Sequence, residues 1–416
     1  MRKTLSAIGF VATLGVLVMS SCTSAEVGVG QTAAQQILFV AGPGSPLTIA
    51  SEPSDVVLGD LNKDGRLDLV VANGQARIIL VLLNDGTGDS AKVGAGAGKS
   101  DGPFRVVAAR TTAVPDIPGE MVLGDINTDG NLDLAFISHD SYGVTLLLGD
   151  GRGGLALAPN SPIVMKQGQH PHTHGLGIGD FNGDGKLDLV TVNNADNDLS
   201  VALGDGRGGF ARAPGSPFAV GPSPYPLAVG DVNIDGHLDM VATATATGPA
   251  RAQQLPLSRA LTLLLGDGRG GFQTSQVPMR TGEPWFVAIG DVNGDRKPDL
   301  VVTHHEKHEL TVLLGDGAGR FRETGDSPLD MGHNAYQMVL ADVNRDGRTD
   351  IVATAGDGIR IMLGDGSGGF KAAPHPPLAT GRGTWRMAVG DINRDGKLDV
   401  VTCNSESKTV SVLLGN

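Results

Sequence analysis

The sequence predicts an all-β protein, a seven-bladed β-propeller with four antiparallel strands per blade and a last blade closed by the N-terminal strand. First, the acidic motif D-x-N-x-D-x-x-x-D occurs seven times, at intervals of 49 to 65 residues. Second, the units contain short apolar runs and many of the 62 glycines, without the period of an amphipathic helix. Third, a repeat of about 50 residues built from several short strands is typical of a propeller, since solenoid repeats are usually shorter.

The third unit shows how the elements of a blade are ordered. LGIGD predicts the first strand, LDLVTV the second, LSVALG the third, and the segment from Phe210 the fourth. The acidic loop therefore joins the first and second strands. The seven motifs begin at Asp60, Asp125, Asp180, Asp231, Asp291, Asp342 and Asp391.

The two ends of the chain predict how the ring closes. The last unit stops at VSVLLGN, after its third strand, while QILFVAGPGSPL (36–47) is similar to GGFARAPGSPF of the third unit. We expect 36–47 to supply the missing fourth strand, because this pairing removes an exposed sheet edge.

The N-terminus predicts a lipoprotein signal peptide over residues 1–21. Arg2 and Lys3 precede an apolar run, 5–19, that is too short to span a bilayer. The run ends in MSSC, which resembles the lipobox of bacterial lipoproteins, although Met19 stands where Leu is usual. The resemblance implies lipidation of Cys22, with ordinary secretory cleavage nearby as the alternative.

These features predict an exported protein held on a bacterial membrane by its lipid. Residues 22–35 would be a tether and 36–416 the propeller. Thr23 after the cysteine favours the outer membrane, either at the cell surface or facing the periplasm. Cys403 would be the only other cysteine, so no internal disulfide can form, and its run DVVTCN predicts a buried strand residue.

Each acidic motif offers the oxygen ligands that a hard cation such as calcium requires. Positions 1, 3, 5 and 9 carry carboxylates or amides, the position-7 carbonyl adds an oxygen, and glycine at position 6 permits a sharp turn. The predicted calcium ligands are Asp60, Asn62, Asp64, Asp68, Asp125, Asn127, Asp129, Asp133, Asp180, Asn182, Asp184, Asp188, Asp231, Asn233, Asp235, Asp239, Asp291, Asn293, Asp295, Asp299, Asp342, Asn344, Asp346, Asp350, Asp391, Asn393, Asp395 and Asp399.

Two alternatives to these calcium loops are weaker. An EF-hand needs glutamate at position 12, where this chain has strand residues such as Val71 and Phe136, so the aspartate at position 9 is the expected closing ligand. One copy could be an Asx-rich turn without metal, but seven copies, each holding three carboxylates close together, favour bound cations.

The formal charge agrees with calcium binding. Loss of residues 1–21 changes the net charge from −13 to −15, and the motifs hold 21 of the 45 acidic residues. Seven divalent ions would offset most of this charge, and the acidity argues against nucleic acid as a partner.

The blade-five motif, DVNGDRKPD, departs from the pattern because Arg296 replaces the glycine at position 6. If the backbone φ there is positive, this replacement costs about 1 kcal/mol. We therefore expect up to seven Ca²⁺, with the blade-five site weakest.

These loops, together with GDGRGGF and APGSP, resemble the FG-GAP/VCBS repeat family, whose blades also build the head of integrin α-subunits. The resemblance covers about 36–416. It implies structural calcium ions on the lower face and partners on the upper face, without naming a ligand.

GDGRGG (149–154) also matches a dinucleotide-binding fingerprint. A strand follows it where that motif needs a helix, so we predict a hairpin turn instead.

The rare aromatic residues collect at one repeat position, six residues before each motif. The series is Ser54, Gly119, His174, Tyr225, Trp285, Tyr336 and Trp385. The family geometry implies that this position and the turn between the second and third strands both lie on the upper face. The candidate ligand-face residues are Tyr142, His172, His174, Tyr225, Trp285, His304, His305, His308, Tyr336 and Trp385.

This pattern leaves two functions open. Aromatic rings beside polar groups suit a protein or carbohydrate ligand, although the same rings could serve only as packing between blades. The alternative implied by the resemblance is a metal-dependent carbohydrate-active lyase or dehydratase, since some propellers of this type are such enzymes. HPHTH (170–174) could hold a transition metal, without an evident carboxylate or cysteine to complete the site. No Ser/His/Asp or paired-carboxylate arrangement stands out, so we assign no catalytic residue and favour a binding module.

Overall fold

The computed structural model describes residues 38–49, 51–84, 86, 105–169, 171–245, 260–280, 282–304 and 307–416. The predicted signal peptide (1–21) and the predicted tether (22–35), which includes Cys22, lie outside these ranges, as do His170 and His305. Within them, no helix is long and apolar enough to cross a membrane.

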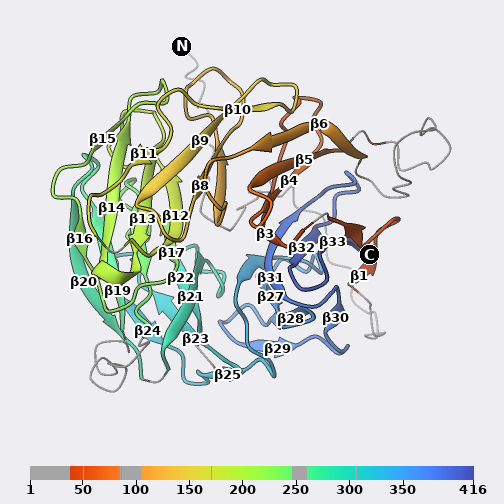
Figure 1. Ribbon diagram of the computed structural model, residues 1–416. Helices are drawn as coiled ribbons and strands as arrows, with labels where there is room; N and C mark the ends of the chain where they lie inside the picture. The colour runs from red at the N-terminus through yellow and green to blue at the C-terminus, as the bar shows by residue number, and fades with distance from the viewer. Residues whose placement is uncertain are drawn as a thin grey trace, which may run out of the picture.

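Seven antiparallel sheets form the molecule, as predicted, and they follow one another around a common axis (Figure 1). Blade 1 consists of β3 (Pro53–Gly59), β4 (Asp68–Asn73), β5 (Ile78–Leu83) and β6 (Arg105–Ala113). Blade 2 consists of β7 (Met121–Gly124), β8 (Asp133–Ile137), β9 (Gly143–Gly149), β10 (Leu155–Leu157) and β11 (Ile163–Val164). Blade 3 consists of β12 (Thr173–Gly179), β13 (Asp188–Asn193), β14 (Asp198–Gly204), β15 (Phe210–Arg212) and β16 (Phe218–Ala219).

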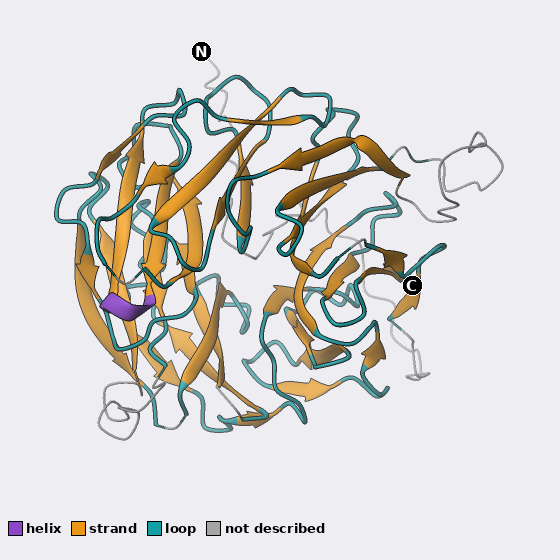
Figure 2. Cartoon of the chain, in the orientation of Figure 1, coloured by secondary structure: helices purple, strands orange, loops and turns teal. Residues whose placement is uncertain are grey.

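Blades 4 to 6 repeat this order. Blade 4 consists of β17 (Leu227–Gly230), β18 (Asp239–Ala242), β19 (Ala260–Gly266) and β20 (Phe272–Pro278). Blade 5 consists of β21 (Pro284–Gly290), β22 (Asp299–His304), β23 (Glu309–Gly315), β24 (Phe321–Glu323) and β25 (Leu329–Asp330). Blade 6 consists of β26 (Met338–Ala341), β27 (Asp350–Thr354), β28 (Gly358–Gly364), β29 (Phe370–Ala372) and β30 (Leu378–Ala379). In the described ranges the one helical element is a 3₁₀ turn at Asn194–Asp196 (Figure 2).

Blade 7 is closed by the N-terminal segment, as predicted. It contains β31 (Thr384–Gly390), β32 (Asp399–Asn404) and β33 (Thr409–Gly415) from the C-terminal end of the chain. β1 (Phe39–Ala41) and β2 (Leu47–Thr48) both pair antiparallel with β33, with Phe39 opposite Gly415 and Leu47 opposite Val410. The first and last parts of the chain therefore share one sheet.

The hydrophobic core is divided into seven clusters, one between each pair of neighbouring sheets. The cluster between blades 7 and 1 packs Leu69 and Val71 against Val401 and Cys403, all 1% exposed or less. Cys403 is thus a buried strand residue, as predicted. Because every sheet is covered on both faces, the strands read as continuous apolar runs.

The first strand of each blade separates the two faces. In blade 3, His174 lies at the start of β12, and Asp180 directly follows its end at Gly179. Six residues of extended strand span about 20 Å. First strands of neighbouring blades contact one another. The acidic loops therefore surround one end of the axis, and the residues six positions earlier surround the other.

In blades 2 to 7 a glycine ends the third strand because no side chain fits there. An added Cβ on Gly204 would lie 2.2 Å from the carbonyl oxygen of Leu187, and on Gly266 2.3 Å from that of Leu238. The N–H of this glycine donates to the buried aspartate that ends the acidic motif, as Gly204 does to Asp188 at 2.7 Å, and in blade 1 Asn84 takes its place. GDGRGG lies between β9 and β10, which confirms the predicted hairpin turn.

Candidate functional site

Five predicted ligand-face residues form a continuous row of rings at one end of the propeller, from blade 3 to blade 7. The ring centroids are separated by 3.9 Å from His174 to Tyr225, 4.3 Å to Trp285, 6.2 Å to Tyr336 and 4.1 Å to Trp385. Each residue lies within two positions of the start of its blade's first strand, so the repeat itself places the rings side by side. We call these five residues the aromatic row.

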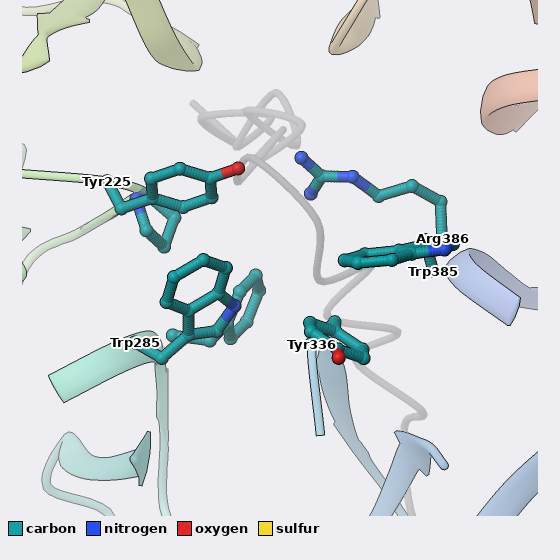
Figure 3. A pocket seen from close by; sticks show the side chains of 7 residues that line it. Tyr225, Trp285, Tyr336, Trp385 and Arg386 are labelled. Atoms are coloured by element: carbon teal, nitrogen blue, oxygen red, sulfur yellow. The ribbon is translucent and has the colours of Figure 1, made fainter. Parts of the chain in front are cut away.

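The aromatic row borders a narrow cavity (Figure 3). Tyr225 and Trp285 line one side, and Tyr336, Trp385 and Arg386 line the other. The cavity volume is about 30 Å³, which is room for about one water molecule. Trp385 is 46% exposed, although the other rings of the row are partly covered. A ligand larger than water would therefore lie across the rims of the rings, not inside the cavity.

A buried ionic cluster sits one residue further along the first strands of blades 7, 1 and 2. Arg386 forms an ion pair with Glu120. The Asp55 carboxylate is fully buried and accepts the N–H groups of Val56 and Met121, both at 2.8 Å, so it links blade 1 to blade 2. Burial raises the pKa of Asp55 to about 7, against the opposing effect of Arg386.

Sequence reasoning missed this cluster, although three charged residues in otherwise apolar first strands were a signal for it. Blades 6 and 7 are linked in a similar way. The Gln337 side chain donates to the carbonyl of Met387 at 2.9 Å and accepts its N–H at 2.7 Å. In blades 1, 2, 6 and 7, the residue five positions before the acidic motif thus links neighbouring blades.

Three other candidates on this face, Tyr142, His304 and His308, lie away from the aromatic row. Tyr142 is 8% exposed and donates its hydroxyl to Asp196 beside Lys166. His304 does not lie in the expected turn: it ends β22, is 1% exposed and contacts the Thr311 hydroxyl at 2.7 Å, and burial lowers its pKa to about 4. Because its ring is covered, His304 cannot present a ligand surface.

His308 is exposed in the turn between β22 and β23, where its ring lies 6.3 Å from that of His333. His305 lies outside the described residues, so its predicted place on this face stays a prediction.

A cluster of three histidines continues the row into blade 2. His174 and His172 approach each other at 2.8 Å between their Nε2 atoms. His139 follows β8 of blade 2, and its ring centroid lies 4.0 Å from that of His172. Burial lowers the pKa of His174 to about 3 and also lowers that of His172. His139 is not among the ligand-face candidates predicted from the sequence, because its neighbours in space belong to another blade.

At the opposite end of the propeller, the acidic loops share one hydrogen-bond pattern. In blade 3, Asp180 accepts the N–H of Asp184 at 3.1 Å and of Gly185 at 2.8 Å. Asn182 accepts the N–H of Asp184 at 2.9 Å, and Asp184 that of Lys186 at 3.0 Å. The side-chain oxygens at positions 1, 3 and 5 therefore point into the loop, as calcium coordination requires.

Each loop has two residues in the left-handed backbone conformation, and the sequence predicted only the one at position 6. Position 6 has positive φ, 81° at Gly185 and 64° at Arg296, so the blade-five arginine does adopt the strained conformation. Position 4 is also left-handed and is often not glycine, as at Lys63 and Ile234. Such strain is tolerated where surrounding contacts hold the backbone.

The aspartate at position 9 has a structural role that the sequence did not predict. Asp188 is fully buried, and its two oxygens accept the N–H groups of Phe181 at 2.8 Å and Gly204 at 2.7 Å. It therefore ties the loop to the third strand, and its role as the closing calcium ligand stays a prediction. Burial raises its pKa to about 7, with a further rise from the carboxylates of Asp180 and Asp184.

A basic residue at position 7 pairs with the position-5 aspartate in five loops, a feature that the sequence analysis missed. The pairs are Arg66–Asp64, Lys186–Asp184, Lys297–Asp295, Arg348–Asp346 and Lys397–Asp395. In blade 3, three carboxylates and one base leave a formal charge of −2, which one divalent cation would balance. The other four loops carry a second base, Lys63, Arg296, Arg345 or Arg394, and have a formal charge of −1. The donor set thus fits calcium in its oxygen content.

Comparison with known proteins agrees with this architecture. The FG-GAP-like repeat matches residues 125–191, 180–242, 291–353 and 342–402, which together span more than half of the chain. The chain belongs to the FG-GAP-like repeat family. Each match starts at the first aspartate of one motif and ends soon after the next motif. No curated protein matches the chain.

Solved structures share the fold of this FG-GAP-like propeller at low sequence identity. BBS1N, solved in complex with ARL6DN, has a TM-score of 0.56 at 10% identity, with 91% of this chain and 96% of that chain covered. An Agrocybe aegerita lectin that recognises non-reducing terminal N-acetylglucosamine has a TM-score of 0.51 at 19% identity, with 80% and 81% covered. Virginiamycin B lyase from Staphylococcus aureus has a TM-score of 0.50 at 12% identity, with 89% and 98% covered.

Proposed function

We propose that this protein is an exported, calcium-stabilised binding module that takes a protein or carbohydrate ligand across the aromatic row. The observation that carries the proposal is the unbroken row of rings from His174 to Trp385. The other end of the molecule repeats one loop seven times, whereas this end concentrates both tryptophans of the chain at equivalent positions.

The chemistry of the row supports recognition of a flat or extended ligand. Trp385 and Tyr336 form a tilted pair at 4.1 Å with Trp385 exposed, and Arg386 lies beside them on the cavity. Tryptophan, tyrosine and arginine are the residues that most often dominate binding interfaces. Structural neighbours of this fold include a protein solved with a protein partner and a lectin, so both ligand classes suit such a propeller.

Calcium is the proposed structural cofactor, bound by positions 1, 3, 5 and 9 of each motif with the position-7 carbonyl. The ions would screen the three carboxylates of each loop and fix the connection between first and second strands. In this proposal they do not contact the ligand, because the loops and the aromatic row lie at opposite ends of the first strands.

The test is a glycan and peptide array probed with the calcium-loaded protein, followed by titration of the best ligand against variants. We expect Trp385→Ala and Trp285→Ala to weaken binding tenfold or more, the size of effect typical of an interface hot spot, that is, on the order of 2 kcal/mol. Leu157→Ala is a matched control, because Leu157 is 47% exposed on an outer strand. Ligand binding that survives both tryptophan variants would rule out the aromatic row.

A metal-dependent lyase or dehydratase is the second candidate, and the cluster of His139, His172 and His174 favours it. Turnover of an array-identified glycan that depends on an added transition metal would support this candidate. Binding of the glycan without turnover in the presence of metal would contradict the enzyme and favour the binding module.

A further inference from the structure

Three histidines from two blades bring their ring nitrogens together near one end of the aromatic row. One ligand atom from each of His139, His172 and His174 lies within 4.8 Å of the others. The rings meet edge to face, with interplanar angles of 68° (His139–His172), 77° (His139–His174) and 64° (His172–His174). Rings that stack cannot aim their nitrogens at a common point, whereas rings at steep angles can.

The backbone holds these side chains in place. Thr173, between two of the histidines, donates its N–H to the carbonyl of His139 at 3.0 Å and its hydroxyl to that of Ser141 at 2.7 Å. The carbonyl of His172 accepts the N–H of Asn194 at 2.8 Å. The turn of blade 2 is thus tied directly to the first strand of blade 3, so the cluster does not depend on the chance meeting of mobile side chains.

Two neighbours orient the rings. Asp140 contacts Nδ1 of His139 at 2.6 Å, which leaves Nε2 of that ring to face the cluster. His174 lies against the ring of Tyr225 at 3.9 Å, and its Nε2 faces that of His172. A carboxylate on the far nitrogen of a histidine is the usual outer-shell partner of a metal ligand, because it fixes the ring and strengthens its basicity.

We propose that His139, His172 and His174 bind one transition-metal ion of the zinc type, with Asp140 orienting His139. Three imidazoles suit Zn²⁺ and its late first-row neighbours, whereas calcium and magnesium prefer oxygen. Zinc–nitrogen distances of about 2.0–2.1 Å place tetrahedral ligand nitrogens about 3.4 Å apart, so the rings need to shift by about 1 Å. His139 is exposed, which leaves its ring room for this shift.

Three protein ligands leave a coordination position open, as in catalytic and ligand-binding zinc sites. The position would lie beside Tyr225, at the blade-3 end of the aromatic row. The site is distinct from the acidic loops, which lie at the other end of the propeller. It is also independent of the proposed ligand binding, because metal affinity can be measured with no organic ligand present.

The experiment titrates Zn²⁺ into the full chain, produced without a polyhistidine tag and kept in excess Ca²⁺ so that the acidic loops are not available to zinc. Binding is followed by calorimetry and by competition with a chromophoric chelator, and Co²⁺ is substituted to report the ligand field through its visible spectrum. We expect one equivalent of tightly bound Zn²⁺ and a cobalt spectrum of a four- or five-coordinate nitrogen site.

Variants separate this site from other histidines. We expect His139→Ala and His172→Ala each to abolish the tight equivalent, and Asp140→Asn to weaken it roughly tenfold, the lower range for outer-shell partners. His308→Ala is the control, because His308 is an exposed histidine on the same face. His139 and Asp140 are exposed, so their variants should keep the thermal melt of the parent protein in calcium.

Several outcomes would overturn the proposal. One is the absence of a tight zinc equivalent in the parent chain. Another is retention of that equivalent by both histidine variants, and a third is an equal loss in His308→Ala. An octahedral cobalt spectrum without nitrogen ligands would also reject the three-histidine site, even if one equivalent of metal were bound.

Discussion

On the face of the acidic loops, every blade carries the same nine-residue turn, with aspartate at positions 1, 5 and 9 and asparagine at position 3. On the opposite face, the residue six positions before each motif changes from serine and glycine in blades 1 and 2 to histidine, tyrosine or tryptophan in blades 3 to 7. One strand joins the two positions in each blade, so the same scaffold supports a uniform end and a varied end.

Under the proposed function, this difference assigns stability to one end of the propeller and recognition to the other. A feature that recurs in all seven blades, such as the fully buried aspartate at position 9, serves a need that every blade has. A feature confined to some blades, such as the ionic cluster of Asp55, Glu120 and Arg386 or the three histidines, breaks the symmetry and can define a site. If this separation holds, changes at the uniform end should alter stability, and changes at the varied end should alter binding.

The largest expected effect comes from removing calcium. Each ion that binds only the folded state adds RT ln(1 + [L]/Kd), about 2.7 kcal/mol per site at a free concentration of 100 Kd. Thermal melts with and without a calcium chelator should therefore differ by many degrees, with restoration on adding calcium. An unchanged melt after verified metal removal would show that the acidic loops need no ion.

A smaller effect should follow from Gly204→Ala at the end of β14. The new Cβ would lie 2.2 Å from the Leu187 carbonyl oxygen, so the strand ends must move apart and weaken the N–H bond to Asp188. We expect a loss of about 1–3 kcal/mol, typical of overpacking, by denaturant unfolding in calcium. Gly325→Ala is the control, since an added Cβ there has no heavy atom within 4 Å. Equal stability of the two variants would refute this steric account.

Arg296→Gly should stabilise the protein. Arg296 has a φ of 64°, a left-handed conformation that costs a non-glycine residue about 1 kcal/mol. We expect a gain of about that size by denaturant unfolding, and tighter calcium binding by the blade-five loop in calorimetric titration. Arg296→Ala keeps the strain and removes only the side chain, so an equal gain in that variant would mean that the backbone is not the cause.

The smallest change in stability should come from Trp385→Ala at the varied end. The Trp385 ring is 46% exposed, and its removal ends one aromatic contact, with Tyr336. We therefore expect the free energy of unfolding to fall by about 0.5 kcal/mol in denaturant unfolding. Ligand affinity should fall far more than stability. A large loss of stability would instead assign the aromatic row to packing between blades, the alternative that the sequence leaves open.

Much of the fold followed from the sequence because the repeat is strong. Seven acidic motifs gave the number of blades, and the similarity of 36–47 to the third unit gave the closing strand that pairs with β33. The single position that gathers Tyr225, Trp285, Tyr336 and Trp385 was also visible, because equivalent positions in a propeller lie at equal radius and height around one axis. Counting along the chain was enough for these features.

The sequence by itself determined what repeats: the number and order of strands, the acidic loops, and which residues occupy equivalent positions in successive blades. Only the tertiary structure decided what depends on contacts between blades or on side-chain direction. It buried His304, placed Tyr142 beside Asp196, paired Arg386 with Glu120 and brought His139 of blade 2 to His172 and His174 of blade 3. Periodicity fixes where a residue lies within its own blade, whereas its neighbours across the blade boundary depend on how two sheets pack.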